Sequence, residues 1–425
     1  MSSILIRNAE FIVTPEKVWE KRSIYIEDSR IVEFSKNEAD VVIEGDGMVV
    51  VPGLINAHTH IPMTFLRGIA EDKPLAKWLE EDIWPRERKI NAKLVYNAAL
   101  LGIAEALRYG TVGFVDMYFY EEEIAKAASE MGIRAWVGYG LIDLGNAEKR
   151  EEEIKKAVKL IKAVKRLKDP RIRGIVTPHA PYTCSPELLI EAHEIAVENS
   201  TIYHIHISET REEVEKVRRK YGKTPLKYLD SLGVVDGYFV GAHGVWLTPG
   251  ERVILARRGG SVVHCPSSNL KLGSGIAPVK KYIGSGINIA LGTDGPASNN
   301  DLDMWEEMRL MAFLQKLKDT SFPGIEALKA ATANGARALR FDGGIIREGA
   351  PADLVLVDLN SLSFQPVLSR QQVANNLVYA CSGRDVKYVI VNGELKVKNG
   401  RLVDEEKVER AMNETRKLAE KLGIL

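Results

Sequence analysis

Residues 52–60 read PGLINAHTH, and this stretch sets the fold expected for the chain of 425 residues. It continues a run of three valines, so we expect an apolar strand over residues 49–54 with polar groups directly after it. Residues i and i+2 of a strand point to the same side, so His58 and His60 face one point. Two imidazoles aimed together favour a first-row metal ion such as zinc.

Seven further apolar runs have the length of strands, at residues 111–116, 134–138, 173–177, 202–207, 238–242, 261–264 and 288–292. Helical patterns separate most of them, including residues 93–109, 124–131, 151–168 and 186–198. Eight strands alternating with helices predict an α/β protein whose central part, residues 53–347, is a (β/α)8 TIM barrel.

The two ends of the chain have a different pattern. Residues 1–52 consist of short β-rich runs with turns, and residues 348–425 contain an Asn392–Gly393 pair between two β-rich runs, which is a hairpin signal. The stretch 405–422 has the pattern of an amphipathic helix. We therefore expect residues 1–52 and 348–425 to pair into a second, smaller β domain interrupted by the barrel.

The amino-acid composition of the chain limits the kinds of binding partner and the cellular location that we expect. The 58 basic residues balance the 58 acidic ones, so there is no electrostatic reason to expect nucleic acid or an anionic membrane. The N-terminus has no basic segment followed by a sustained apolar one, and no apolar stretch reaches about 18 residues, so we expect no signal peptide and no membrane span. The cysteines, Cys184, Cys265 and Cys381, form no CxxC pair, which fits a reducing cytoplasm and a packing role. Charged residues make up 27% of the chain. Such a content is typical of a protein from a thermophile, and it is explained equally well by ordinary helices with solvent-exposed faces.

Histidine is scarce, and its positions are informative. Seven of the eight histidines lie in or just after a predicted strand, and His193 lies in a helical pattern. One such histidine alone is more often an ordinary core or surface residue, but several together at strand ends indicate the catalytic face of a barrel. In His204-Ile205-His206 only one of the two histidines is needed as a ligand, and His206 is nearer the mouth. Asp294, in LGTDG after the last strand, adds a carboxylate.

Five segments together resemble the amidohydrolase superfamily. They are PGLINAHTH (52–60), HIHISET (204–210), GAHG (241–244), SSNLKLGSGIAPV (267–279) and LGTDGPASNN (291–300). The resemblance covers nearly the whole chain and is greatest to the methylthioadenosine/S-adenosylhomocysteine deaminases and their triazine-hydrolysing relatives. It implies that the domain formed by the chain ends is a β-sandwich.

The resemblance also implies roles for individual residues. The metal ligands are His58, His60, His206 and Asp294. Glu209 matches a proton-transfer glutamate, His243 a catalytic histidine, and Asp294 takes a proton besides binding the metal. The residues that match substrate contacts are Trp78, Glu87, His179, Glu209 and Ser298.

Two absences define the subtype. Family members with two metals carry a carboxylated lysine at the end of strand four, where this chain has Thr177–Pro178–His179, so we expect one divalent ion per subunit. Zinc is the expected ion, with iron, nickel and manganese as alternatives. The signature of the cytidine-type zinc deaminases is also missing.

Three positions have competing interpretations. Glu209 could instead be an acidic residue at a helix N-terminus. Trp78 fits plain helix packing, and Glu87 lies in a charge run with Arg86 and Arg88. Relatives carry an arginine at the end of strand three for the homocysteine carboxylate. This chain has Tyr139 there, and Arg150 is the nearby candidate to replace that arginine.

The expected function is hydrolytic deamination of an adenine nucleoside, such as 5′-methylthioadenosine, S-adenosylhomocysteine, 5′-deoxyadenosine or adenosine. A metal-bound hydroxide attacks C6, and ammonia leaves with the inosine derivative as the other product. The alternatives are triazine chlorohydrolase or aminohydrolase, guanine or cytosine deaminase, and a non-catalytic barrel scaffold. The expected partner is a small-molecule nucleoside, and the resemblance implies a homo-oligomer.

Overall fold

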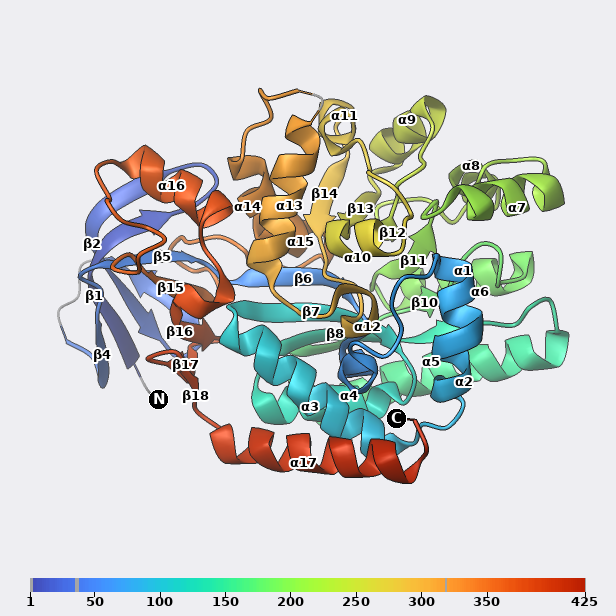
Figure 1. Cartoon of the computed structure of the whole chain (residues 1–425), viewed down its shortest axis with the longest axis horizontal. Helices are drawn as coiled ribbons and strands as arrows, with labels where there is room; N and C mark the ends of the chain where they lie inside the picture. The colour runs from blue at the N-terminus through green and yellow to red at the C-terminus, as the bar shows by residue number, and fades with distance from the viewer. Residues whose placement is uncertain (1–2, 35–37, 318, 425) are drawn as a thin grey trace.

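The computed structural model describes residues 3–34, 38–317 and 319–424. Its centre is a parallel sheet that curls on itself, which we call the barrel (Figure 1). The strands are β6 (Leu54–Thr59), β7 (Thr111–Tyr118), β8 (Arg134–Leu141), β9 (Ile172–Gly174), β10 (Thr177–Pro178), β11 (Tyr203–Ile207), β12 (Phe239–His243), β13 (Ser261–His264) and β14 (Asn288–Leu291). Every residue of β7 is buried, as expected for strands covered on both faces.

The barrel has two hydrogen-bonded parts, β6 to β10 and β11 to β14. A bridge between Val176 and Tyr203 joins them on one side. On the other side the Asp294 N–H donates to the His58 carbonyl at 3.0 Å. The carboxyl ends of the first and last strands therefore lie side by side.

Helices surround the barrel, and the predicted helical stretches are confirmed. Several begin at side-chain caps, as in α6, where Ser185 accepts from the Leu188 N–H. Those within the barrel part are η1 (Ile61–Leu66), α1 (Leu75–Lys77), η2 (Trp78–Ile83), α2 (Trp84–Glu87), α3 (Ala92–Arg108), α4 (Glu121–Met131), α5 (Ala147–Leu167), α6 (Pro186–Glu198), α7 (Arg211–Tyr221), α8 (Pro225–Ser231), α9 (Pro249–Arg258), α10 (Pro266–Lys271), α11 (Val279–Gly284), α12 (Pro296–Asn299), α13 (Met304–Lys316), α14 (Ile325–Ala331) and α15 (Ala333–Ala338).

The two ends of the chain share one nine-stranded sheet, at the left of Figure 1. Its strands are β1 (Ser3–Val13), β2 (Val18–Glu27), β3 (Arg30–Glu33), β4 (Val41–Glu44), β5 (Met48–Pro52), β15 (Leu354–Asp358), β16 (Val386–Val391), β17 (Glu394–Lys398) and β18 (Arg401–Leu402). β5 pairs antiparallel with β15, which links the N-terminal strands to the C-terminal ones. The hairpin at Asn392–Gly393 is confirmed, since β16 and β17 pair antiparallel and both turn residues have positive φ.

The C-terminal part also contains α16 (Arg370–Tyr379), η3 (Gly383–Asp385) and α17 (Glu405–Lys421). The expected amphipathic helix is α17, which leaves the sheet and packs against α3 of the barrel.

The predicted strand over residues 49–54 is wrong as the first barrel strand. The valine run belongs to β5 of the terminal sheet, and the barrel begins with β6 at Leu54. Gly53 separates the two, and a Cβ there would lie 2.3 Å from the Val112 side chain. His58 is consequently inside a barrel strand, and His60 follows its end.

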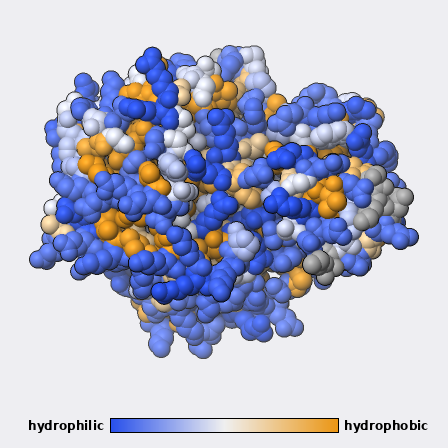
Figure 2. All heavy atoms as spheres, turned by 180° about the vertical axis from the view of Figure 1, so that it is seen from behind, coloured by the Kyte–Doolittle hydropathy of each residue, from blue (hydrophilic) through white to orange (hydrophobic). Residues whose placement is uncertain are grey.

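Apolar side chains concentrate in two buried clusters. The larger spans the barrel and one face of the terminal sheet, and the smaller lies on the other face of that sheet. Hydrophilic residues cover most of the face seen from behind, with apolar patches between them (Figure 2). The three free cysteines are buried, as expected of packing residues. No helix in the described ranges is both long and apolar enough to cross a membrane.

Candidate active site

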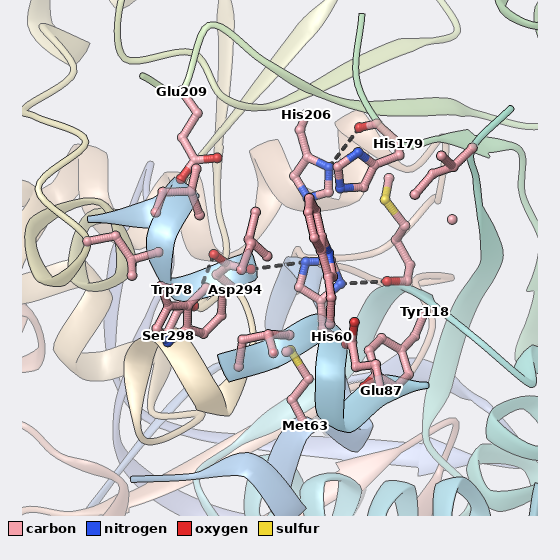
Figure 3. A pocket seen from close by; sticks show the side chains of 18 of the residues that line it. His60, Met63, Trp78, Glu87, Tyr118, His179, His206, Glu209, Asp294 and Ser298 are labelled. Atoms are coloured by element: carbon pink, nitrogen blue, oxygen red, sulfur yellow. Dashed lines mark hydrogen bonds and ion pairs between the residues drawn. The ribbon is translucent and has the colours of Figure 1, made fainter. Parts of the chain in front are cut away.

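Four side chains converge at the carboxyl ends of the barrel strands, and three of them, His60, His206 and Asp294, are labelled in Figure 3. His58 and His60 come from the end of β6, His206 from β11, and Asp294 from the loop after β14. Ligand atoms of the three histidines lie within 4.8 Å of one another. Oδ1 of Asp294 lies 3.5 Å from Nε2 of His58 and 3.2 Å from Nε2 of His60. The spacing predicted from the sequence therefore brings these groups together.

Backbone carbonyls orient two of the three imidazoles. Nδ1 of His60 donates to the Met117 carbonyl at 2.5 Å, and Nδ1 of His206 donates to the His179 carbonyl at 2.8 Å. A proton fixed on Nδ1 leaves a lone pair on Nε2, and this is the usual arrangement around a bound metal.

The third imidazole, His58, has a histidine as its outer partner. Its Nδ1 lies 2.8 Å from Nε2 of His204, so the two histidines of the HIH motif have different surroundings. Nε2 of His58 is buried and has no hydrogen-bond partner among the described residues. A buried, unpartnered imidazole nitrogen facing a carboxylate fits a divalent metal ion as the missing partner.

Asp294 is held by several donors. Its Oδ2 accepts from Ser268 Oγ at 2.6 Å and from Ser298 Oγ at 3.2 Å, and its Oδ1 accepts from the Gly295 N–H. Burial alone would raise the pKa of the Asp294 carboxyl, but hydrogen bonding and electrostatic attraction from His58 and His60 lower that pKa well below its ordinary value. The residue also has φ of +63°, a left-handed conformation that is costly for a non-glycine residue.

Glu209 and His243 face each other beside Asp294. Oε2 of Glu209 lies 3.6 Å from Nε2 of His243, and Ser274 donates to Oε1 of Glu209. The Asn269 amide donates to Nδ1 of His243, which leaves the His243 proton on Nε2, toward Glu209. Burial, together with the charge of Asp294, raises the pKa of Glu209 to about 8, whereas burial lowers the pKa of His243 to about 4.

Glu213 was missed from the sequence. Its two carboxylate oxygens accept from the N–H groups of Ser208 and Glu209 at 2.8 and 2.7 Å. Ser208 has φ of +49°, so Glu213 stabilises a strained turn that carries Glu209. The sequence signal was the Thr210 cap followed three residues later by a glutamate.

A pocket of about 820 Å³, part of it open to solvent, lies in front of these groups. Trp78, Glu87, His179 and Ser298 line it together with Glu209, so the structure places these five predicted substrate contacts around one space (Figure 3). Burial raises the pKa of Glu87, while Tyr118 and His60 lower it. Sequence reasoning did not find the apolar and aromatic lining contributed by Met63, Phe119, Tyr118 and Tyr182.

Arg150 is placed elsewhere. It lies on α5, its Nε is 3.3 Å from Oε1 of Glu191 on α6, and it is not among the residues that line the pocket. The Tyr139 hydroxyl donates to Glu122 at 2.6 Å. Proximity of Arg150 to strand three in sequence was misleading, because α5 directs the side chain toward the neighbouring helix.

Residues 49–396 match the family model described as the amidohydrolase family. The chain belongs to the amidohydrolase family. This assignment confirms the resemblance inferred from the five motifs, and the convergent histidines and Asp294 agree with the metal-dependent chemistry of that family.

Three relatives of this amidohydrolase are informative. The 5-methylthioadenosine/S-adenosylhomocysteine deaminase of Thermococcus sibiricus is 46% identical over 399 residues, covering 92% of this chain and 93% of that protein. The 5′-deoxyadenosine deaminase of Methanosphaera stadtmanae is 44% identical over 409 residues and covers 95% of both. A solved adenosine deaminase from Xanthomonas campestris with bound zinc is 36% identical, with a TM-score of 0.93 and 99% coverage of each chain. The Thermococcus relative fits the expectation of a thermophile protein.

Proposed function

We propose that this amidohydrolase deaminates adenosines at the 6-amino group, with 5′-methylthioadenosine, S-adenosylhomocysteine, 5′-deoxyadenosine and adenosine as candidate substrates. The observation that carries the proposal is geometric: Glu209, His243 and Asp294 line one pocket beside the convergent imidazoles of His60 and His206. Burial raises the pKa of Glu209, whereas the Asp294 carboxylate accepts hydrogen bonds from Ser268, Ser298 and the Gly295 N–H. Two carboxyl groups in such different surroundings can divide the roles of proton donor and proton acceptor.

The cofactor that we propose is one divalent ion per subunit, zinc in the first instance, held by His58, His60, His206 and Asp294. When bound, such an ion lowers the pKa of water toward about 7 and so supplies the nucleophile of a hydrolysis. The Nδ1 partners of the three imidazoles and the unpartnered Nε2 of His58 support this assignment.

The remaining chemistry belongs to the side chains. Asp294, which is ionised, accepts the proton of the attacking water. Glu209, protonated at neutral pH, donates to N1 of the purine, so that the ring does not accumulate negative charge as C6 becomes tetrahedral. His243 points its Nε2–H into the same space and stabilises the oxygen added at C6. Asp294 then passes its proton to the leaving amine, and the hydroxyl at C6 returns a proton to Glu209 as the carbonyl of the inosine derivative forms.

Substrate binding uses further residues that line the same pocket. Glu87 accepts hydrogen bonds from the ribose hydroxyls, Trp78 covers the nucleoside, and His179 and Ser298 contact the base. The names of the Thermococcus and Methanosphaera relatives support an adenosine derivative over guanine, cytosine or a triazine.

Three further assignments belong to the proposal. Residues 1–52 and 348–425 form a β-sandwich domain, which the buried cluster on one face of the nine-stranded sheet supports, and residues 53–347 form the hydrolase barrel. The protein acts in the cytoplasm, which its three unpaired cysteines favour. It works as a homo-oligomer, which sedimentation of the purified protein can test.

The experiment is a side-by-side assay of the zinc-loaded protein on the four adenosines, with guanine, cytosine and a chlorinated triazine as comparisons. We expect the adenine absorbance band to change and ammonia to appear with at least one adenosine derivative. Ammonia or chloride released only from the comparison compounds would overturn the proposal. A purified, unchelated protein that holds no metal would favour a scaffold role instead.

A further inference from the structure

We infer that Arg86, held by the backbone of the residues that follow α17, is a positioning residue for substrate binding. The inference rests on the proposed function, because it takes Trp78 and Glu87 as contacts of the nucleoside. It concerns a different part of the molecule, namely the connection between the C-terminal helix and the mouth of the barrel.

Two of the proposed substrate contacts, Trp78 and Glu87, lie on one short helical segment. α1, the π-helical turn η2 and α2 follow one another without a break over residues 75–87. Trp78 lies at the start of η2 and Glu87 at the end of α2, and both line the pocket. A π turn is a rare helix form that is frequent at functional sites, and contacts from outside the segment hold its two ends.

Arg86 supplies such support next to Glu87. Its Nη1 donates to the Asp82 carbonyl at 2.8 Å, one turn earlier in the same segment. Its Nε donates to the Ile424 carbonyl at 3.1 Å. Lys89 donates to the Gly423 carbonyl, just beyond the segment. The Arg86 guanidinium therefore links residues 75–87 to the residues that follow α17, and Lys89 adds a second hydrogen bond between the same parts of the chain.

The residues that accept these bonds are firmly placed. Ile424 is 2% exposed and belongs to the barrel core. α17 lies along α3, where Lys93 pairs with Glu414 at 2.8 Å (Figure 1). Ile424, which follows α17, lies beside α2, where its carbonyl accepts from Arg86. The carbonyls of Gly423 and Ile424 are therefore fixed points relative to the barrel, and they hold the end of the segment that carries Glu87.

The start of the segment has its own attachments. Trp78 Nε1 donates to the Ala70 carbonyl at 3.2 Å, and Glu71 pairs with Lys271 of α10 at 2.7 Å. The segment is thus attached to the barrel on both sides. Loss of the Arg86 tie should release the Glu87 side while leaving the Trp78 side in place, and it should leave the metal ligands untouched.

Two variants test this, each removing a different partner. Arg86→Met keeps an apolar stem but no donors. A chain ending at Leu422 removes the accepting carbonyls, together with the buried Ile424 side chain, and leaves the sequence of residues 75–87 unchanged. Lys93→Met is the matched control, because it removes a tie between α17 and α3 away from the pocket. Arg86→Lys restores one donor. Metal content, kcat, KM for the best adenosine substrate, and hydrogen exchange of residues 75–88 are measured for all four.

We expect Arg86→Met and the shortened chain to raise KM about tenfold and to leave kcat within about threefold of wild type. The lost hydrogen bond involves a charged group, and it positions Glu87 for substrate binding without touching the reacting atoms. Hydrogen exchange of residues 75–88 should accelerate in both variants, while their metal content should be unchanged. Lys93→Met should have the KM and exchange rates of the wild type. Arg86→Lys should have a KM between those of Arg86→Met and the wild type. KM and exchange equal to those of Lys93→Met would overturn the inference. If the wild type acts on no adenosine, the proposed function fails, and the exchange comparison alone decides whether the tie holds the segment.

Discussion

Nε2 of His60 lies 3.2 Å from Oδ1 of Asp294, and these residues follow the first and last strands of the barrel. The same two strand ends are joined by the Asp294 N–H and the His58 carbonyl. The contacts that join the first and last strands of the barrel therefore also bring two ligands of the candidate metal site together. In the proposed metal site, the carboxylate of Asp294 would balance the charge of a cation held by three neutral imidazoles.

Removing that charge tests the metal assignment. Asp294→Asn keeps the shape and the backbone but leaves the metal with neutral ligands only. We expect metal content to fall below half of wild type and kcat to fall by at least about 10²-fold, since Asp294 is also the proton acceptor. Elemental analysis and turnover measure the two effects. Asp319→Asn, an exposed carboxylate paired with Lys280, is the control, and equal metal content in both variants would contradict the assignment.

Glu209→Gln tests the proton donor separately from the metal. The amide keeps the size of the side chain and can still accept from Ser274, but it cannot deliver a proton. We expect metal content to be retained and kcat to fall about 10²- to 10⁴-fold. Turnover near that of the wild type in a fully metal-loaded variant would eliminate Glu209 as the donor.

Glu213→Gln tests the support beneath Glu209. A glutamine offers one acceptor oxygen where the carboxylate offers two, so the N–H of either Ser208 or Glu209 loses its partner. We expect a loss of about 1–3 kcal/mol in the free energy of unfolding and at least about a tenfold fall in kcat, with metal retained. Chemical denaturation and turnover provide the measurements. The exposed neighbour Glu212→Gln is the control, and a kcat loss of the same size there would argue against a specific role for Glu213.

Gly292→Ala tests how tightly β14 approaches β6. A Cβ at this glycine would lie 2.8 Å from the His58 carbonyl oxygen and 2.9 Å from its nitrogen, and neither backbone atom can move without moving the imidazole. We expect a destabilisation of about 1–3 kcal/mol together with weaker metal binding. Thermal unfolding with and without added zinc measures both. Gly237→Ala, where nothing lies within 4 Å of the added atom, should behave as wild type.

The convergence of the metal ligands could be predicted from the sequence because it depends on local rules. A His-x-His spacing at a strand end fixes two side chains on one side, and parallel strands bring His206 and Asp294 to the same end. The start of the barrel could not be predicted in this way. The residues on both sides of Gly53 are apolar and β-prone, and only the close approach of Val112 shows why the chain changes sheets there.

The roles of residues that depend on contacts between distant loops could also not be predicted from the sequence. Ser268 donates to Asp294 at 2.6 Å, closer than the predicted Ser298 at 3.2 Å, and no spacing along the chain encodes that order. The placement of Arg150 failed for the opposite reason. Nearness in sequence suggested a contact that the direction of α5 does not allow.

Glu307, a buried carboxyl outside the candidate active site, predicts how stability depends on pH. It accepts from Asn299 at 2.9 Å and from the Ser267 N–H at 3.2 Å, and burial raises its pKa to about 8. Between its ordinary pKa of 4.5 and about 8, the folded protein holds a proton that the unfolded chain releases. Stability contributed by this group is therefore present below pH 4.5 and is lost as the pH rises through 8.

Glu307→Gln removes that titration. We expect the free energy of unfolding of the wild type to fall from pH 5 to pH 9 by at least about 1 kcal/mol more than that of the variant, since one pKa unit corresponds to about 1.4 kcal/mol. Other titrating groups contribute equally to both proteins and cancel in the difference. Denaturant unfolding at the two pH values gives the comparison, with the exposed Glu306→Gln as control. Parallel pH dependence of Glu307→Gln and wild type would show that Glu307 is ionised in the folded protein throughout this range.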